Sequence, residues 1–161
     1  MFLGRGVVIG RDAGRLAALG LVVAILAACS DSRPTESLRA MPEAAIVFPG
    51  SVSVKEVATP QVDSPDGKSG ATYGHMFGAN AGVDEVVAWF DAELMRRGWG
   101  QISPGSTNNS LAVVLWTNGD AQFRIAVNSP ADLTPDLQAK LKGYSIEIDA
   151  RVQQIYPAPS G

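Results

Sequence analysis

The chain carries few of the side chains that enzymes use for catalysis. Its one cysteine is Cys29 and its one histidine is His75. A zinc site takes about four ligands, and nitrogen and sulfur ligands are too few here to build one. A Ser-His-Asp triad would have to use His75, and no serine stands in the G-x-S-x-G pattern of a nucleophile elbow. The sequence therefore predicts no metal and no cofactor, and His75 is interpreted as a structural histidine in a strand.

Glu147 and Asp149 are the paired carboxylates that a glycosidase would need. Residues two apart on a strand share a face, so the two side chains are expected side by side. The same spacing is typical of a solvated strand face, and no aromatic platform for a sugar stands nearby. We interpret the pair as part of a solvent-exposed strand face and predict that the protein is not an enzyme. An unrecognised hydrolase is kept as a third hypothesis, after the two functions given at the end of this subsection.

The first 30 residues carry the most specific pattern in the chain. Arg5, Arg11 and Arg15 precede an apolar run at residues 16–28, and small residues lead to Cys29. A basic start, an apolar run and small residues form a secretory signal peptide. The run has about 13 residues, fewer than the roughly 20 that span a bilayer core.

Leu26, Ala27, Ala28 and Cys29 resemble the lipobox of bacterial lipoproteins. This resemblance implies cleavage before Cys29 and diacylglycerol on its thiol. Two or three acyl chains hold a small protein stably, since each buried CH₂ contributes about 0.8 kcal/mol. The resemblance therefore implies a protein anchored to the cell membrane and facing outside the cytoplasm, or sorted to the outer membrane in a Gram-negative host.

The charge balance limits the partners. The full chain has a net charge of −3. Removal of residues 1–28 takes away three arginines and Asp12, which leaves 10 basic and 15 acidic residues and a net charge of about −5. An acidic domain argues against a nucleic-acid partner. The remaining partners are the membrane, through the lipid on Cys29, and an envelope protein; the oligomeric state is open.

The mature chain is expected to divide into three parts. Residues 29–42 are polar and predict a flexible tether with an average reach of about 20 Å. Residues 43–157 predict one α+β domain, and residues 158–161 a disordered tail. The domain should hold an antiparallel sheet of about five to six strands, with one long helix packed on one face and a short second helix. The expected strands are 52–58, 71–78, 99–102, 111–117, 120–127 and 144–152, the expected helices are 82–98 and 135–141, and 59–69 is expected to be a loop.

The segment 82–98 is the clearest helix. Val86, Phe90 and Leu94 lie on one apolar stripe, Asn80 or Ala81 precedes the start, and Gly98 suits the left-handed position after the end. The phrase from Leu94 to Gly98 and Trp99 is similar to one that recurs in small bacterial lipoproteins. That likeness supports the fold rather than a chemistry.

A hairpin is expected around Asn118-Gly119, since Asn-Gly favours a two-residue turn. Such a turn pairs Trp116 with Ala121 and gives an apolar face for the core. The opposite face carries Leu111, Val113 and Leu115. Together with Trp89, which lies off the helical stripe, these residues form the candidate interaction surface if nothing in the domain covers them.

The leading hypothesis is a lipid-anchored, non-catalytic interaction or structural module of the cell envelope. The alternative is a lipoprotein that binds a small or lipidic ligand between helix and sheet. That second function needs a cavity lined by residues such as Phe90, Val114 and Phe123.

Overall fold

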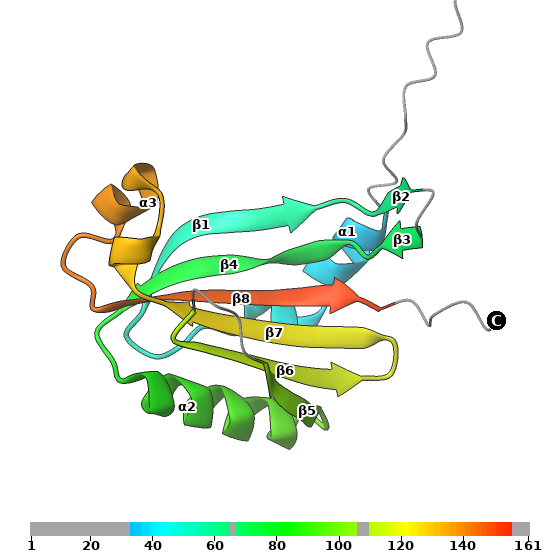
Figure 1. The fold of residues 1–161 in the computed structure, drawn as a ribbon. Coiled ribbons are helices and arrows are strands. Elements are labelled where there is room, and N and C mark those ends of the chain that lie inside the picture. Colours follow the sequence, from blue (N-terminus) through cyan, green and yellow to red (C-terminus); the bar gives the residue numbers. More distant parts are fainter. Residues whose placement is uncertain (1–32, 65–66, 106–109, 156–161) are drawn as a thin grey trace, which may run out of the picture.

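Six antiparallel strands form one sheet in the order β1-β4-β8-β7-β6-β5 (Figure 1). The computed structural model describes residues 33–64, 67–105 and 110–155. The fold is of the α+β class, as the sequence predicts. The sheet strands are β1 (Val52–Thr59), β4 (Thr72–Ala79), β5 (Gly100–Gly105), β6 (Ala112–Asn118), β7 (Ala121–Asn128) and β8 (Ile146–Gln154), and β2 (Val62–Ser64) pairs with β3 (Gly67–Ser69) in a separate hairpin.

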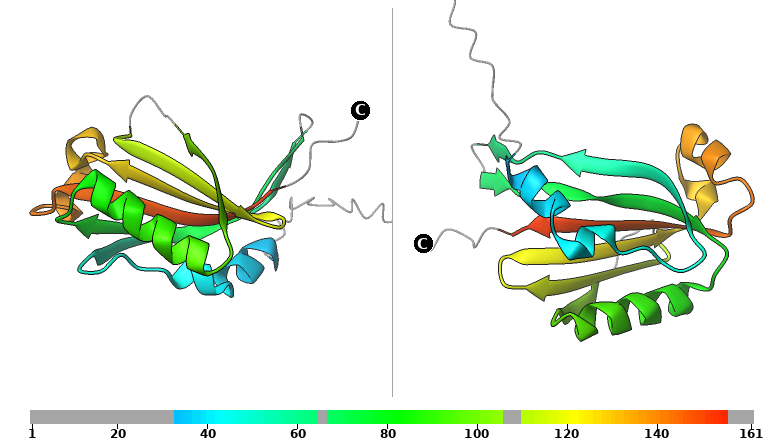
Figure 2. Two further views of the ribbon diagram at one scale, coloured as in Figure 1. Left: turned by 90° about the horizontal axis from the view of Figure 1, so that it is seen from below. Right: turned by 180° about the vertical axis from the view of Figure 1, so that it is seen from behind.

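The helical elements lie on both sides of this sheet. The two N-terminal elements lie behind it in Figure 1 and in front of it in the second view of Figure 2. The longest helix, α2, runs beside β5 and β6, and α3 lies at the end of the sheet far from α1. The elements are α1 (Arg33–Arg39), the 3₁₀ helix η1 (Pro42–Ala45), α2 (Val83–Arg96), the 3₁₀ helix η2 (Pro130–Asp132) and α3 (Pro135–Lys140).

Helix α1 corrects the predicted tether. Thr35 and Leu38 are three residues apart, so they share a helix face, and they are only 7% and 5% exposed. The guanidinium of Arg39 lies 5.0 Å from the ring centroid of Tyr73 and donates a 2.7 Å hydrogen bond to Glu56. The prediction of a flexible tether over 29–42 is therefore wrong from residue 33 onward, and the folded domain includes residues before 43. The predicted signal peptide, lipobox and Cys29 lie outside the described residues.

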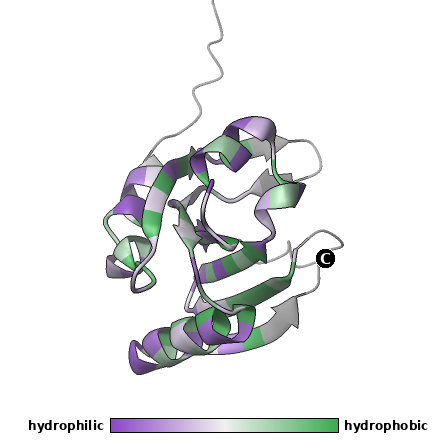
Figure 3. Ribbon diagram, turned by 90° about the vertical axis from the view of Figure 1, so that its left-hand side faces the viewer, coloured by the Kyte–Doolittle hydropathy of each residue, from purple (hydrophilic) through white to green (hydrophobic). Residues whose placement is uncertain are grey.

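Helix α2 buries the predicted stripe. Val86, Phe90 and Leu94 are each 0% exposed, and Figure 3 shows hydrophilic residues along the outer side of this helix. The helix ends as predicted, because Gly98 has φ +83° and the Trp99 N–H donates to the Leu94 carbonyl at 3.0 Å. At its start the N-cap is Gly82.

The prediction of Asn80 or Ala81 as the N-cap is wrong. The Glu85 carboxylate accepts a hydrogen bond from the Gly82 N–H at 3.4 Å, which satisfies a donor at the helix start. The Asn80 side chain instead accepts a hydrogen bond from the Ser145 N–H at 2.8 Å. It thereby ties the end of β4 to the start of β8.

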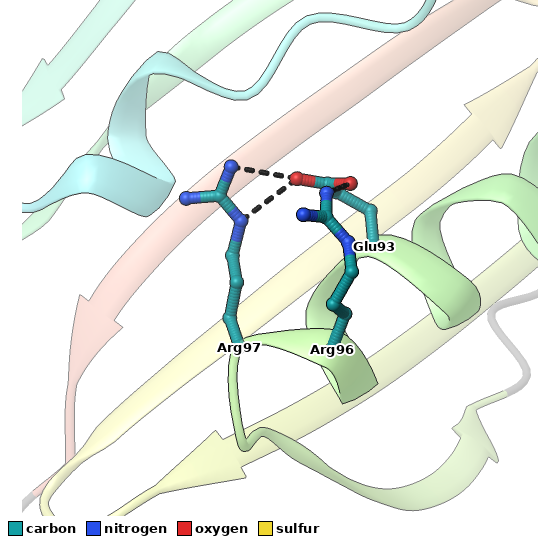
Figure 4. A network of polar contacts seen from close by, with 3 residues as sticks. All are labelled: Glu93, Arg96 and Arg97. Atoms are coloured by element: carbon teal, nitrogen blue, oxygen red, sulfur yellow. Dashed lines mark hydrogen bonds and ion pairs between the residues drawn. The ribbon is translucent and has the colours of Figure 1, made fainter.

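An ion-pair network occupies the last turn of α2 (Figure 4). The Glu93 carboxylate accepts hydrogen bonds from Arg97 Nε at 2.8 Å and Arg97 Nη2 at 2.6 Å, and it also pairs with Arg96. The hydrogen bonds from Arg97 and then Arg96 hold the pKa of Glu93 below its usual value. The arginines also suit the negative end of the helix dipole.

The β6–β7 hairpin keeps its predicted faces and changes its register. The turn residues are Gly119, with φ +61°, and Asp120, so Trp116 pairs with Phe123 rather than with Ala121. A displacement of two residues leaves every side chain on the same face.

Two further predictions are wrong: a hairpin occupies part of the predicted loop 59–69, and Tyr144 lies before β8 rather than in it.

Replacement of Leu38 by alanine tests whether α1 belongs to the folded domain. We expect Leu38→Ala to lower the free energy of unfolding by about 2 kcal/mol or more, as replacement of other buried leucines by alanine does. The measurement is urea unfolding of the purified protein. Val47→Ala is the matched control, because Val47 is 48% exposed and lies in the same N-terminal segment. Equal stability of Leu38→Ala and the wild type would contradict the packing of α1.

Candidate functional site

The sheet face opposite α1 and α2 carries a cluster of charged residues at its centre. Cross-strand pairs place residues of neighbouring strands in rows on this face. We call it the charged face. Its three rows at the α3 end and the centre are Val52, Gly78, Glu147 and Asn128, then Lys55, Met76, Asp149, Ala126 and Val113, then Val57, Gly74, Arg151, Arg124 and Leu115.

Glu147 is the most deeply buried charged residue of the cluster, with no exposed surface. Asn128 Nδ2 donates a 2.6 Å hydrogen bond to Glu147 Oε2. The other oxygen, Oε1, has no hydrogen-bond partner among the described residues. A buried carboxylate oxygen without a donor is costly, so this residue requires an explanation.

An apolar cover lies beside Glu147. Gly78 is the direct cross-strand neighbour of Glu147 in β4. A Cβ on Gly78 would come within 2.6 Å of Tyr144 Cδ2 and 3.0 Å of Leu141 Cδ2. The Tyr144 ring and Leu141 therefore lie directly on the backbone of Gly78, and only glycine leaves room for them. The segment after α3 thus closes the end of the charged face at which Glu147 lies.

Burial is the main cause of the raised pKa of the Glu147 carboxyl. Loss of solvent raises the pKa of this carboxyl from its usual 4.5 to about 7. The nearby Asp149 carboxylate raises the pKa further, whereas the hydrogen bond from Asn128 and the charges of Arg151 and Arg124 lower it. The carboxyl therefore changes its protonation near neutral pH.

Asp149 lies in a different environment on the same strand. Arg151 Nε donates to Asp149 Oδ1 at 2.6 Å and Arg151 Nη2 donates to Oδ2 at 2.5 Å. Arg124 Nη1 lies 3.9 Å from Asp149 Oδ2. Both carboxylate oxygens are thus engaged by a guanidinium, and the side chain is 8% exposed.

The prediction that Glu147 and Asp149 form a wet strand face is wrong. Strand β8 lies between β4 and β7, and the chain after α3 folds back over the end of the sheet. A general acid must reach its substrate within hydrogen-bond distance. Glu147 has no exposed surface, and Asp149 is held by Arg151, so in this arrangement neither carboxylate is presented to a substrate.

The cluster includes residues that sequence reasoning did not single out: Asn128, Arg124 and Tyr144. The one usable signal was Gly78, because a glycine inside a strand often marks a close approach of another group. The alternation of β8 indicates which residues share a face, but it does not indicate what covers that face.

His75 lies on the opposite side of the sheet, where α1 packs. Its ring is 5.5 Å from the Tyr73 centroid and 5.8 Å from the Phe77 centroid. The three side chains share one face of β4, because alternate residues of a strand point to the same side. The His75 side chain therefore points away from the charged face and belongs to the edge of the aromatic core.

The predicted interaction residues do not form one surface. Leu111 is 55% exposed, Val113 is 5% exposed and Leu115 is half-buried. Trp89 packs edge-on against Phe48 at 5.5 Å and so covers a flank of the core. The space predicted for a ligand between helix and sheet is filled, since Phe90 and Phe123 lie 5.9 Å apart and both are at most 1% exposed.

A shallow cavity of about 460 Å³ is lined by residues of η2, α3 and the chain that follows α3. Apolar side chains form much of its wall and two polar side chains border it. They are Pro130, Pro135, Leu141 and Tyr144, with Gln138 and Lys142. The Gln138 amide already donates to the carbonyls of Ala131 at 3.0 Å and Leu133 at 2.8 Å, which stabilises the segment.

Within residues 33–64, 67–105 and 110–155, no group of three or more His, Cys, Asp or Glu side chains is arranged to hold a metal ion. No helix in the described part of the chain is both long and apolar enough to cross a membrane. Comparisons of the chain with known protein families, curated proteins and solved structures found no match.

Replacement of Glu147 by glutamine tests the buried carboxyl. The folded pKa of about 7 lies above the unfolded value of 4.5, so the folded protein binds the proton more tightly. Stability from this group is present below pH 4.5 and is lost as the pH rises to about 7. At about 1.4 kcal/mol per pH unit, the loss is about 3 kcal/mol. We expect Glu147→Gln to remove this decline, measured by urea unfolding at pH 5 and pH 8.

The comparison uses the change between the two pH values, because the glutamine amide has its own desolvation penalty. Asp132→Asn, at an exposed carboxylate of η2, is the control and should keep the wild-type decline. An unchanged pH dependence in Glu147→Gln would show that Glu147 titrates as an ordinary exposed glutamate.

Proposed function

We propose that the protein is a membrane-anchored, extracytoplasmic lipoprotein that serves as a non-catalytic interaction or structural module of the cell envelope. The observation that carries this proposal is the lipobox Leu26-Ala27-Ala28-Cys29, which follows a basic start and an apolar run. The cysteine is the only one in the chain, which fits a residue used for lipid attachment rather than for a disulfide.

The state of the polar groups supports a non-catalytic role. The Asp149 carboxylate is held by Arg151 through two hydrogen bonds, and Glu147 has no exposed surface. His75 lies between two aromatic rings on the other side of the sheet. These groups stabilise the domain but present no set of acid, base and nucleophile.

The packing also weakens the alternative of a ligand held between helix and sheet. That function needs a cavity near Phe90, Val114 and Phe123. These residues are at most 3% exposed, and Phe90 and Phe123 face each other as neighbouring rings. An envelope protein is therefore the partner class that we favour.

Removal of the lipidation site tests the anchor. We expect Cys29→Ala to remain uncleaved as the precursor or to be released from membranes, because its side chain has no thiol to carry the lipid. The measurement is membrane fractionation of cells with the mass of the N-terminal peptide. Ser30→Ala is the matched control, since it alters the next residue and keeps the cysteine.

A Cys29→Ala protein that fractionates with membranes in mature-sized form would contradict lipid anchoring. Cross-linking in intact cells then tests the interaction role on the same pair of variants. We expect one envelope protein to be cross-linked in stoichiometric amount to the Ser30→Ala protein and to be absent from the Cys29→Ala protein. A co-purified small molecule without a protein partner would favour ligand binding instead.

A further inference from the structure

One row of cross-strand partners marks the end of the sheet at which α1 begins. The Thr35 hydroxyl of α1 donates a 3.4 Å hydrogen bond to the carbonyl of Thr59, the last residue of β1. Helix α1 therefore begins at this end, which we call the α1 end (Figure 1). The row of partners across the sheet here is Thr59, Thr72, Gln153, Gln122, Thr117 and Gly100.

The chain between Cys29 and α1 is short. Helix α1 begins at Arg33, so only Ser30, Asp31 and Ser32 separate it from the cysteine. Consecutive Cα atoms are about 3.8 Å apart, so these four steps span at most about 15 Å in any conformation. The packing of Thr35 and Leu38 opposes lengthening of this connection by unfolding of α1.

The other end of the sheet is out of reach of this connection. Glu147 precedes Gln153 by six residues in β8, which corresponds to about 20 Å along the strand. The η2–α3 segment lies beyond Glu147, at the end opposite α1 (Figure 1). A lipid on Cys29 would thus hold one end of the domain close to the bilayer and leave the other end free.

The α1 end carries side chains that suit a headgroup region. Val62 in β2 is 50% exposed, Met95 in the last turn of α2 is 60% exposed, and the adjacent Arg96 side chain is 69% exposed. Apolar side chains insert into the boundary between headgroups and acyl chains, and arginine keeps its guanidinium in the polar layer. Asp120, in the β6–β7 turn, lies at the same end and is exposed.

We propose that the α1 end, formed by strands β2 and β3, the β6–β7 turn and the last turn of α2, lies against the lipid bilayer. The η2–α3 segment with its cavity then points into the aqueous space. This orientation rests on the proposed lipidation of Cys29 and adds to it which surface contacts lipid. A partner in the aqueous space therefore meets the η2–α3 end first.

Site-specific fluorescence tests the orientation in the full-length lipidated protein. The lipid occupies the only native thiol, so an introduced cysteine is the single site for a donor dye. Asp120→Cys places the dye at the α1 end and Ala139→Cys places it on α3; both positions are exposed. The vesicles contain phosphatidylethanolamine and phosphatidylglycerol with an acceptor dye on a fraction of the headgroups.

Because the two positions differ by more than about 20 Å along the strands, we expect at least about twofold more energy transfer from residue 120 than from residue 139. A second pair, Gln101→Cys and Asp136→Cys, should repeat this difference, since both residues are exposed at the corresponding ends. As a control for the fold, each variant should have the same thermal unfolding midpoint as the wild type.

Flotation of the same vesicles separates the two possible failures. Protein that floats with the vesicles but shows equal transfer at both positions, or more from residue 139, overturns the orientation and leaves the anchor standing. Protein that does not float overturns the anchor itself and, with it, the orientation.

Discussion

The double burial of β8 is the constraint on which the rest of this structure depends. One face of the strand carries Ile146, Ile148, Ala150 and Val152, which are at most 5% exposed in the core beneath the N-terminal elements. The other face carries Glu147 and Asp149, which are at most 6% exposed. Covering the first face draws α1 onto the sheet, and covering the second brings Leu141 and Tyr144 over Gly78. Both covers follow from the place of β8 at the centre of the sheet.

Each cover has its own consequence. The apolar cover by α1 shortens the connection to Cys29. A lipid on that residue would therefore restrain the whole domain, which a long flexible segment would not do. The cover over Gly78 lies beside Glu147, and the burial of this residue raises the pKa of its carboxyl to about 7. The two features lie at opposite ends of the sheet, which separates the proposed membrane contact from the buried carboxyl.

Local patterns predict much of the fold and little of the site. The stripe of Val86, Phe90 and Leu94 and the left-handed Gly98 determine α2, because both signals lie within the helix itself. Alternation in β6 and β7 gives the correct faces, whereas the exact turn residues change the partner of Trp116. The burial of Glu147 depends on Tyr144 and Gly78, residues brought together only by the fold. The polar composition of residues 29–42 likewise gives no clear helix signal for α1, because the buried side chains of this helix are Thr35 and Leu38.

Amide hydrogen exchange of the α1 segment in the lipidated protein measures whether this helix is folded on the sheet, and the connection to Cys29 is short only if it is. The amides of Ala40 and Met41 donate 3.1 Å hydrogen bonds to the carbonyls of Glu36 and Leu38. We expect these two amides, like those of β4 and β8, to exchange much more slowly than in an unstructured peptide. Exchange at the rate of an unstructured peptide would contradict it and would restore a loose tether between the lipid and the domain.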